Sequence, residues 1–348
     1  MPYAIRPLSV ESQLVSTAAL SPSAPVTSAN APAEALMRHI LRSGRVLVGG
    51  SMVLAILLTC IATTWWTARE TAGSRLYFDR QVPAESRLAP QPTSLALSCG
   101  TDKLGRSMLG RALLGGMLSL GIGVMAATTS VCLGLTIGLV AGYAGGWVDH
   151  LLMRIVDVLY GLPFVLMVVL LKVAMETPMG ALLVRAQQSR LGHWIPDQSA
   201  NLVVLFLSIG LVSWLTMARV VRGQVMSLRG QPFIEAARAL GLPHWRIFLR
   251  HLLPNLAGPV LVYATMIVPQ AILQESFLSF LGIGIQPPLP TWGALAGEGL
   301  VEGLNPVLGR WWLLVVPCAL LAVTLLSLNF LGDGLRDVLD PRRDQAKL

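Results

Sequence analysis

Six long apolar segments are the feature that most limits what this chain can fold into. Each is long enough to cross a hydrocarbon layer about 30 Å thick as an α-helix, which takes about 20 residues. Inside such a layer the backbone must satisfy its own hydrogen bonds, which an α-helix does within one segment. The predicted spans are Val46–Trp66, Met117–Tyr143, Leu151–Ala174, Leu202–Val221, Leu256–Ile283 and Trp311–Leu331.

Composition supports the same fold class. The 348 residues are 54% hydrophobic and 13% charged, whereas soluble domains carry about 25% charged residues. The mean hydropathy is +0.64. A net charge of +8 is explained by arginines in loops that face the anionic cytoplasmic leaflet, so we expect no nucleic-acid partner. We predict an all-α, polytopic membrane protein with six transmembrane helices.

The distribution of basic residues predicts that both termini face the cytoplasm. With an N-in, C-in topology, the inside segments carry most of the arginines, including six between Arg219 and Arg250. Such an excess is typical of cytoplasmic loops. One loop departs from the rule, because residues 67–116 would lie outside with seven basic residues, among them Arg75, Arg87, Arg106 and Arg111.

The chain divides into segments of different character. The first residues are rich in Ser, Ala and Pro without an apolar period, which is typical of a disordered tail. We expect a disordered cytoplasmic tail at 1–36, an N-terminal segment with the first span at 37–66, and a long extracytoplasmic loop at 67–116. A transmembrane core follows at 117–343, with a charged loop at 233–255 and a short tail at 344–348.

The charged loop at 233–255 predicts two short amphipathic helices at the cytoplasmic surface. Apolar residues recur every three or four positions from Phe233 to Leu240, which places them on one helix face. Glu235 and Arg238 form an i, i+3 pair on another face. Gly241 is expected to end the first helix, and Pro254 to end the second.

Three interpretations of this loop compete. A DNA-binding helix-turn-helix is disfavoured, because two spans bracket the loop and leave no room for a duplex to approach. A segment that simply lies on the membrane surface is the second. The third is a docking element for a cytoplasmic partner.

Several motifs resemble the dipeptide/oligopeptide/nickel branch of bacterial ABC-importer permeases. The charged loop is similar to the EAA loop of such permeases, with Glu235, Ala236, Ala237, Gly241, Leu253 and Pro254 at the matching positions. The stretches GTDKLGRSMLGRALLGG, ESFLSFLGIGIQPPLPTWGALAGEG and LGDGLRDVLDPR, which begin at Gly100, Glu275 and Leu331, resemble other signatures of the same branch. The resemblance covers residues 40–343 and is to the second, C-type permease of the pair. Ser107 and Gly110 depart from the usual Asp and Ser.

The resemblance implies a type I ABC-importer permease fold in the bacterial inner membrane. It also implies a second homologous permease, two ABC ATPase subunits and an extracytoplasmic substrate-binding protein as partners. No G-x-x-x-x-G-K-[ST] phosphate loop occurs in the sequence, so we expect no enzymatic activity and no cofactor in this chain, with ATP and Mg²⁺ bound by the ATPases. The expected cargo is di- or oligopeptides. A nickel or metal-chelate permease is the alternative, followed by a secondary transporter that ATP does not drive.

A few polar residues fall within or beside the predicted spans. Gln270, Gln274 and Glu275 are candidates for the translocation path, and Glu275 either binds a peptide amino group or faces water. Arg154 and Asp157, three residues apart, are expected to form a structural ion pair. No Cys/His cluster has the spacing of a metal site.

Overall fold

The computed structural model describes residues 43–69, 74–92, 94–187, 199–307 and 309–339. Over these residues the chain is helical, and its only β-type pairing is a single bridge between Thr101 and Ser107. The tails predicted at 1–36 and 344–348 lie outside the described residues.

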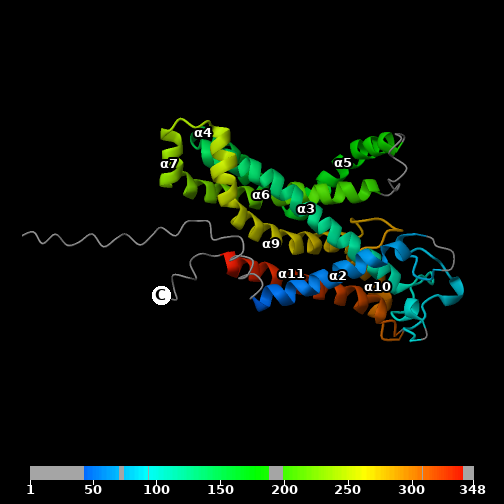
Figure 1. The fold of residues 1–348 in the computed structure, drawn as a ribbon. Coiled ribbons are helices and arrows are strands. Elements are labelled where there is room, and N and C mark those ends of the chain that lie inside the picture. Colours follow the sequence, from blue (N-terminus) through cyan, green and yellow to red (C-terminus); the bar gives the residue numbers. More distant parts are fainter. Residues whose placement is uncertain (1–42, 70–73, 93, 188–198, 308, 340–348) are drawn as a thin grey trace, which may run out of the picture.

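Six of the described helices are long and apolar enough to cross a membrane, which confirms the predicted number. They run lengthwise through the molecule in Figure 1, with the short helix α7 near one end and α10 near the other. Their bounds are α2 Gly44–Ala68, α3 Met108–Ala144, α5 Phe164–Gln187, α6 Ser199–Arg229, α9 Leu253–Phe280 and α11 Trp312–Leu339.

The second span begins earlier than the sequence predicted. Helix α3 starts at Met108, within the segment predicted as a loop at 67–116. Its N-cap is Ser107, whose hydroxyl accepts the backbone N–H of Gly110 at 3.2 Å and so satisfies one of the free donors at the helix start. A 37-residue helix is about 55 Å long at 1.5 Å per residue, so α3 extends beyond the hydrocarbon layer.

The third span was also placed wrongly. The stretch from Leu151 to Ala174 is not one helix, because α4 (Gly146–Tyr160) ends before Pro163 and α5 begins after it. A proline disfavours helical backbone at the residue before it. The stretch that qualifies as a span is Phe164–Leu182, and α4 is a separate short helix at the inner end.

Glycines allow α3 and α6 to pack backbone against backbone. Gly134, Gly138 and Gly142 recur every four residues along the α3 face that meets α6. A Cβ added at Gly138 would lie 2.6 Å from the carbonyl oxygen of Ala218 and 2.7 Å from the Cβ of Val221. Lipid is as apolar as these side chains, so close van der Waals contact is what holds the pair together.

Helices α2 and α11 pack side by side in the same way (Figure 1). A Cβ at Gly49 would lie 2.7 Å from the Ser327 carbonyl oxygen. At the end of the pair, Arg45 forms an ion pair with Asp337 at 2.8 Å. The start of α2 and the end of α11 therefore lie at the same end of the bundle, as the N-in, C-in topology requires.

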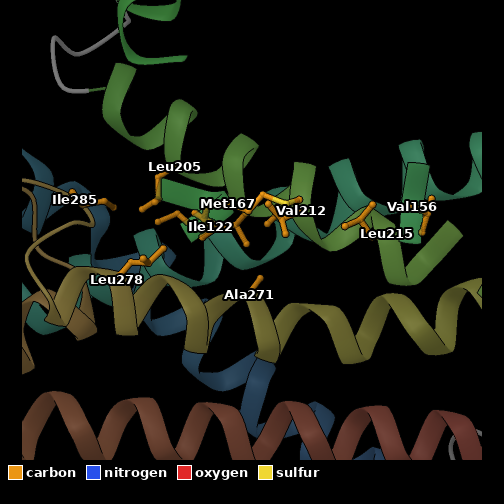
Figure 2. Packing of buried hydrophobic residues seen from close by; sticks show 12 residues of the cluster. Ile122, Val156, Met167, Leu205, Val212, Leu215, Ala271, Leu278 and Ile285 are labelled. Atoms are coloured by element: carbon orange, nitrogen blue, oxygen red, sulfur yellow. The ribbon is translucent and has the colours of Figure 1, made fainter. Parts of the chain in front are cut away.

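A buried apolar cluster joins α4 and α5 to the central helices. Its side chains come from α3, α4, α5, α6, α9 and the loop after α9, and Figure 2 shows them in a row between the helices. This packing holds α5 against α6, next to the cavity described below. The labelled members are Ile122, Val156, Met167, Leu205, Val212, Leu215, Ala271, Leu278 and Ile285.

The outer end is a folded scaffold built from residues 74–92 and 94–107, with the short 3₁₀ turns Pro83–Glu85 and Leu95–Leu97, and from α10 (Trp292–Gly303). Trp292 is fully buried, and its indole N–H donates to the Ala112 carbonyl at 2.9 Å. Arg111 binds Glu298 through two hydrogen bonds of 2.7 and 2.9 Å. Two of the motifs quoted above are therefore in direct contact.

The same scaffold accounts for four of the seven basic residues that depart from the orientation rule. Their guanidinium groups are neutralised by nearby carboxylates and have a structural role. The pairs are Arg75–Glu85 at 3.2 Å, Arg87–Glu302 at 3.0 Å, Arg106–Asp102 at 2.7 Å and Arg111–Asp102 at 2.8 Å.

The two departures from the motif fit the local structure. Ser107 is the N-cap of α3 and also donates its hydroxyl to the Ala96 carbonyl at 2.6 Å. At Gly110 a Cβ would lie 2.2 Å from the Leu76 carbonyl oxygen, so a serine would not fit there unless the backbone moved.

Candidate functional site

The charged loop forms a compact helical connection between α6 and α9, which we call the coupling segment, residues 232–252. It contains α7 (Pro232–Ala239), α8 (His244–Ile247) and a π-helical turn (Phe248–Leu252). Figure 1 places α7 at the inner end of the bundle. Only Gly230 and Gln231 separate α6 from α7, and the Gln231 carbonyl accepts the first backbone donors of α7. The segment is thus attached to two membrane-spanning helices without flexible linkers.

Gly241 makes the bend between the two short helices. The N–H of Leu242 donates to the Ala237 carbonyl at 3.2 Å, and that of Gly241 to the Arg238 carbonyl at 2.9 Å. This pair of bonds is the Schellman motif, which places the residue after the C-cap in the left-handed region. Gly241 has φ +71°, and no atom lies within 4 Å of a Cβ added there. The glycine is required for its conformation and not for close packing within this chain.

One face of the coupling segment is buried against the bundle. Ile234, Ala237, Ile247 and Leu252 are at most 4% exposed. They pack with residues of α6 and α9, including Val221, Val225 and Leu256. Because the contact surface belongs to both spans, a displacement of the segment has to move the inner ends of α6 and α9 with it.

The opposite side of the segment exposes large apolar side chains. Phe233 is 41% exposed, Leu240 81%, Trp245 58% and Leu249 59%. Glu235 and Ala236 are exposed beside them. An isolated exposed leucine is normal, but several within one short segment indicate a protein–protein or lipid contact surface.

The expected stop at Pro254 is wrong. The second short helix continues into α9, and one apolar helical stretch runs from His244 to Phe280. Proline removes a backbone donor and crowds the carbonyl four residues before it. Here a π-helical turn precedes it, with the Leu253 N–H bonded to the Phe248 carbonyl, and such turns accommodate a local change of helix geometry.

A cavity of about 390 Å³ lies among α6, α9 and the break between α4 and α5. We call it the central cavity. Gln270 and Gln274, both predicted for the translocation path, line it from α9. Ser213 and Thr216 of α6 face them, and Tyr160 and Phe164 come from the two sides of the break. The lining thus combines amides, hydroxyls and aromatic rings with aliphatic side chains, as is typical of ligand pockets.

Glu275 does not belong to this cavity and does not face water. Its side chain is completely buried, and it accepts hydrogen bonds from Ser119 of α3 at 3.2 Å and from Ser279 at 2.7 Å. One residue further along a helix turns the side chain by about 100°, which directs Glu275 toward α3 and α10. The prediction that Glu275 faces water is therefore wrong, and its side chain does not line the central cavity.

The predicted ion pair between Arg154 and Asp157 does not form. Asp157 is instead paired with Arg219 of α6 at 2.7 Å, and that guanidinium also lies 4.1 Å from the centre of the Tyr160 ring. The i, i+3 spacing allowed a pair within α4, but the crossing of α4 over α6 brings a closer cation to the carboxylate.

A second ion pair fastens α4 to α6 and has no local sequence signal. Arg222 donates two hydrogen bonds to Asp149, at 2.5 and 2.6 Å. These hydrogen bonds hold the pKa of the Asp149 carboxyl below its usual value, against the opposing effect of its burial. The two residues are 73 positions apart, so only the packing of the helices brings them together.

Sequence reasoning found Gln270 and Gln274 but missed the residues of the central cavity that belong to α4, α5 and α6. Tyr160 and Phe164 were placed inside one continuous span, although Gly161 and Pro163 between them were the signal for a break. Ser213 and Thr216 gave no signal, because short hydroxylated residues are common in transmembrane helices.

Comparison with known proteins links these features to a transport family. The family model described as binding-protein-dependent transport system inner membrane component matches residues 134–345. The oligopeptide transport system permease protein OppC of Haemophilus influenzae is 41% identical over 244 residues, which cover 70% of each chain. The dipeptide permease DppC of Bacillus subtilis is 41% identical over 243 residues, 70% of this chain and 68% of that protein. The glutathione permease GsiD of Pectobacterium atrosepticum is 34% identical over 315 residues, 90% and 93% of the two chains.

Proposed function

Because the chain belongs to the family of binding-protein-dependent transport system inner membrane components, we propose that it forms, with a second permease, the path through which an ATP-driven importer carries peptides. The chain is a multi-pass permease subunit of an ABC importer in the bacterial inner membrane. The coupling segment supports an ATP-driven mechanism, because it is a helical projection joined directly to α6 and α9.

The coupling segment is the proposed contact for an ATPase subunit. Its inward residues hold it to both spans, while Phe233, Leu240, Trp245 and Leu249 remain outside for a partner. Apolar side chains surrounded by charges, here with Glu235 at the edge, are typical of docking surfaces. Movement of the ATPase would then be transmitted to α6 and α9, which line the central cavity, and would alternate access to it.

The remaining partners follow from the family. We expect two ATPase subunits that bind ATP and Mg²⁺, a second homologous permease, and a substrate-binding protein that delivers cargo to the outer scaffold. This chain then has no nucleotide site of its own, and its role is mechanical. The central cavity would be one side of a path that the second permease completes, with Gln270 and Gln274 exposed to the cargo.

Peptides are the proposed cargo because the relatives named above transport oligopeptides, dipeptides and glutathione. The test is the uptake of labelled di- and oligopeptides, of glutathione and of nickel in a strain that lacks this gene. We expect loss of uptake of at least one peptide and its return when the gene is supplied. Loss of nickel uptake alone would show that the cargo is nickel and not a peptide, and it would leave the permease role intact.

The docking role is tested by replacing an outward side chain of the coupling segment. Leu240→Gln should reduce co-purification of the ATPase, because a polar side chain would be buried at the contact without a partner. Val301→Gln is a matched control, since Val301 is 79% exposed on α10 at the opposite end of the molecule. Equal ATPase recovery with both variants would refute docking at this segment.

The cavity role is tested by truncating neighbouring side chains of α9. Gln274→Ala removes an amide from the central cavity, whereas Leu273→Ala shortens a side chain that is 55% exposed and does not line the cavity. We expect a change in the KM of uptake for Gln274→Ala alone, with complex assembly unchanged. The same uptake kinetics in both variants would exclude Gln274 from the path.

A further inference from the structure

A second cavity, of about 580 Å³, lies behind the coupling segment at the inner end of the bundle. We call it the inner pocket. Its wall combines the last turn of α3 and the last residue of α6 with α7, α8 and the π-helical turn. The polar and aromatic side chains that line it are Tyr143, Arg229, Arg238, His244 and Phe248. None of them belongs to the proposed ATPase contact (Phe233, Leu240, Trp245 and Leu249) or lines the central cavity.

Tyr143 organises the pocket. Its hydroxyl shares a hydrogen bond of 2.8 Å with Nδ1 of His244, and its backbone carbonyl accepts one from Arg229 at 3.1 Å. The guanidinium of Arg238 lies 4.8 Å from the centre of its ring, and the Phe248 ring packs edge-on at 4.6 Å. The aromatic contacts and hydrogen bonds hold two guanidinium groups and an imidazole at one opening.

The two arginines of the pocket lack a counter-charge. Nearby, Arg219 and Arg222 of α6 are each paired with an aspartate of α4. Among the described residues, neither Arg229 nor Arg238 forms an ion pair with a carboxylate, and the i, i+3 pair expected between Glu235 and Arg238 is not formed. No acidic residue lines the pocket. Its positive charge is therefore available to an anion.

The position of the pocket points to the source of that anion. Helix α6 ends at Arg229 and α3 ends at Ala144, so the pocket lies at the inner ends of two membrane-crossing helices, on the side predicted to face the cytoplasm. Val140, which also lines it, is 41% exposed one turn further into the bundle. A cationic opening above an apolar wall fits a molecule with a phosphate group and an acyl chain.

We propose that the inner pocket binds a phosphate-bearing anion, with the phosphodiester of an anionic phospholipid of the cytoplasmic leaflet held between Arg229 and Arg238. Arginine suits this role because its planar group donates two hydrogen bonds to one phosphate. A bound phosphate would connect α6 with α7, and so fasten the coupling segment to the bundle. The proposal requires no particular cargo and does not depend on the ATPase contact.

The test uses the assembled importer, purified in detergent and titrated with short-chain phosphatidylglycerol in a native mass spectrometer. Parallel titrations use phosphatidylcholine and inorganic phosphate, which separate a lipid source from free phosphate. The variants are Arg229→Gln with Arg238→Gln, and Arg238→Gln alone. Arg246→Gln is the matched control, because it removes the same charge from the same segment but lies over Trp245, outside the pocket.

We expect the Kd of the most tightly bound phosphatidylglycerol molecule to rise about tenfold or more in the double variant. The reason is that each guanidinium supplies charge-assisted hydrogen bonds. Binding should be unchanged in Arg246→Gln. If inorganic phosphate displaces the lipid at the same site, or binds there alone, the anion site stands and its source is free phosphate. Wild-type affinity in the double variant, or an equal loss in the control, would overturn the proposal. Should the double variant fail to assemble, the exposed Arg238→Gln carries the same comparison.

Discussion

Gln274 and Glu275 are consecutive residues of α9, yet the first lines the central cavity and the second is fully buried against α3. The carboxylate of Glu275 accepts hydrogen bonds from Ser119 on α3 and from Ser276 and Ser279 on its own helix. A buried carboxylate is tolerated only when its oxygens are satisfied in this way. The face of α9 that borders the cavity is thus fixed by a polar contact on its opposite side.

Glu275→Ala is expected to destabilise the protein without a direct effect on cargo binding. It removes the acceptor and leaves buried serine hydroxyls without partners, which costs about 1–3 kcal/mol. The loss of stability is measured as a decrease in the melting temperature of the purified complex. Glu176→Ala is the control, because Glu176 is exposed on α5, and its melting temperature should stay near that of the wild type. If Glu275→Ala melts like this control, the hydrogen bonds contribute nothing to stability.

Gly241→Ala should loosen the coupling segment. An alanine in the left-handed region costs about 1–2 kcal/mol, which would increase the opened fraction of the segment about 5–30-fold. Amide hydrogen exchange of residues 232–252 reports that fraction. Gly223→Ala on α6 is the control, since Gly223 has no positive φ and no atom within 4 Å of an added Cβ. Equal exchange in the two variants would show that the bend does not need glycine.

Gly138→Ala should weaken the packing of α3 on α6. The added methyl group would meet the Ala218 carbonyl oxygen at 2.6 Å, and overpacking of this kind costs about 1–3 kcal/mol. Gly121→Ala on the same helix meets nothing within 4 Å and should be neutral or stabilising, because alanine favours helix over glycine. The melting temperatures of both variants test this, and we expect the lower one for Gly138→Ala. A melting temperature for Gly138→Ala at or above that of Gly121→Ala would contradict the packing argument.

The outer scaffold should lose stability in acid through Glu302. Hydrogen bonds from Arg87, followed by those from Arg310, hold the pKa of the Glu302 carboxyl below its usual value. A group with a lowered pKa in the folded state stabilises the fold above its unfolded pKa, and this contribution is lost as the pH falls through the lowered pKa. Melting temperatures measured over an acidic pH series should therefore decline less steeply for Glu302→Gln. Parallel curves for the variant and the wild type would refute the linkage.

The sequence alone determined the features that depend on local pattern. Apolar length predicted six spans, because the thickness of the membrane sets one length for all of them. The spacing from Phe233 to Gly241 predicted α7 and its bend, because helix periodicity and the freedom of glycine at positive φ are properties of a few adjacent residues. The break between Gly161 and Pro163 also has a local cause, because proline disfavours helical backbone at the residue before it.

Only the tertiary structure decided which groups meet across the bundle. Asp157 pairs with Arg219 and not with Arg154, and Arg111 reaches Glu298 across 187 positions. Glu275 was predicted to bind a peptide amino group or to face water because its sequence neighbours hold no cation, whereas its partner Ser119 belongs to another helix. The reason is physical: helix rotation and crossing follow from packing summed over whole interfaces, such as the glycine contacts of α3 with α6, and no local pattern specifies them.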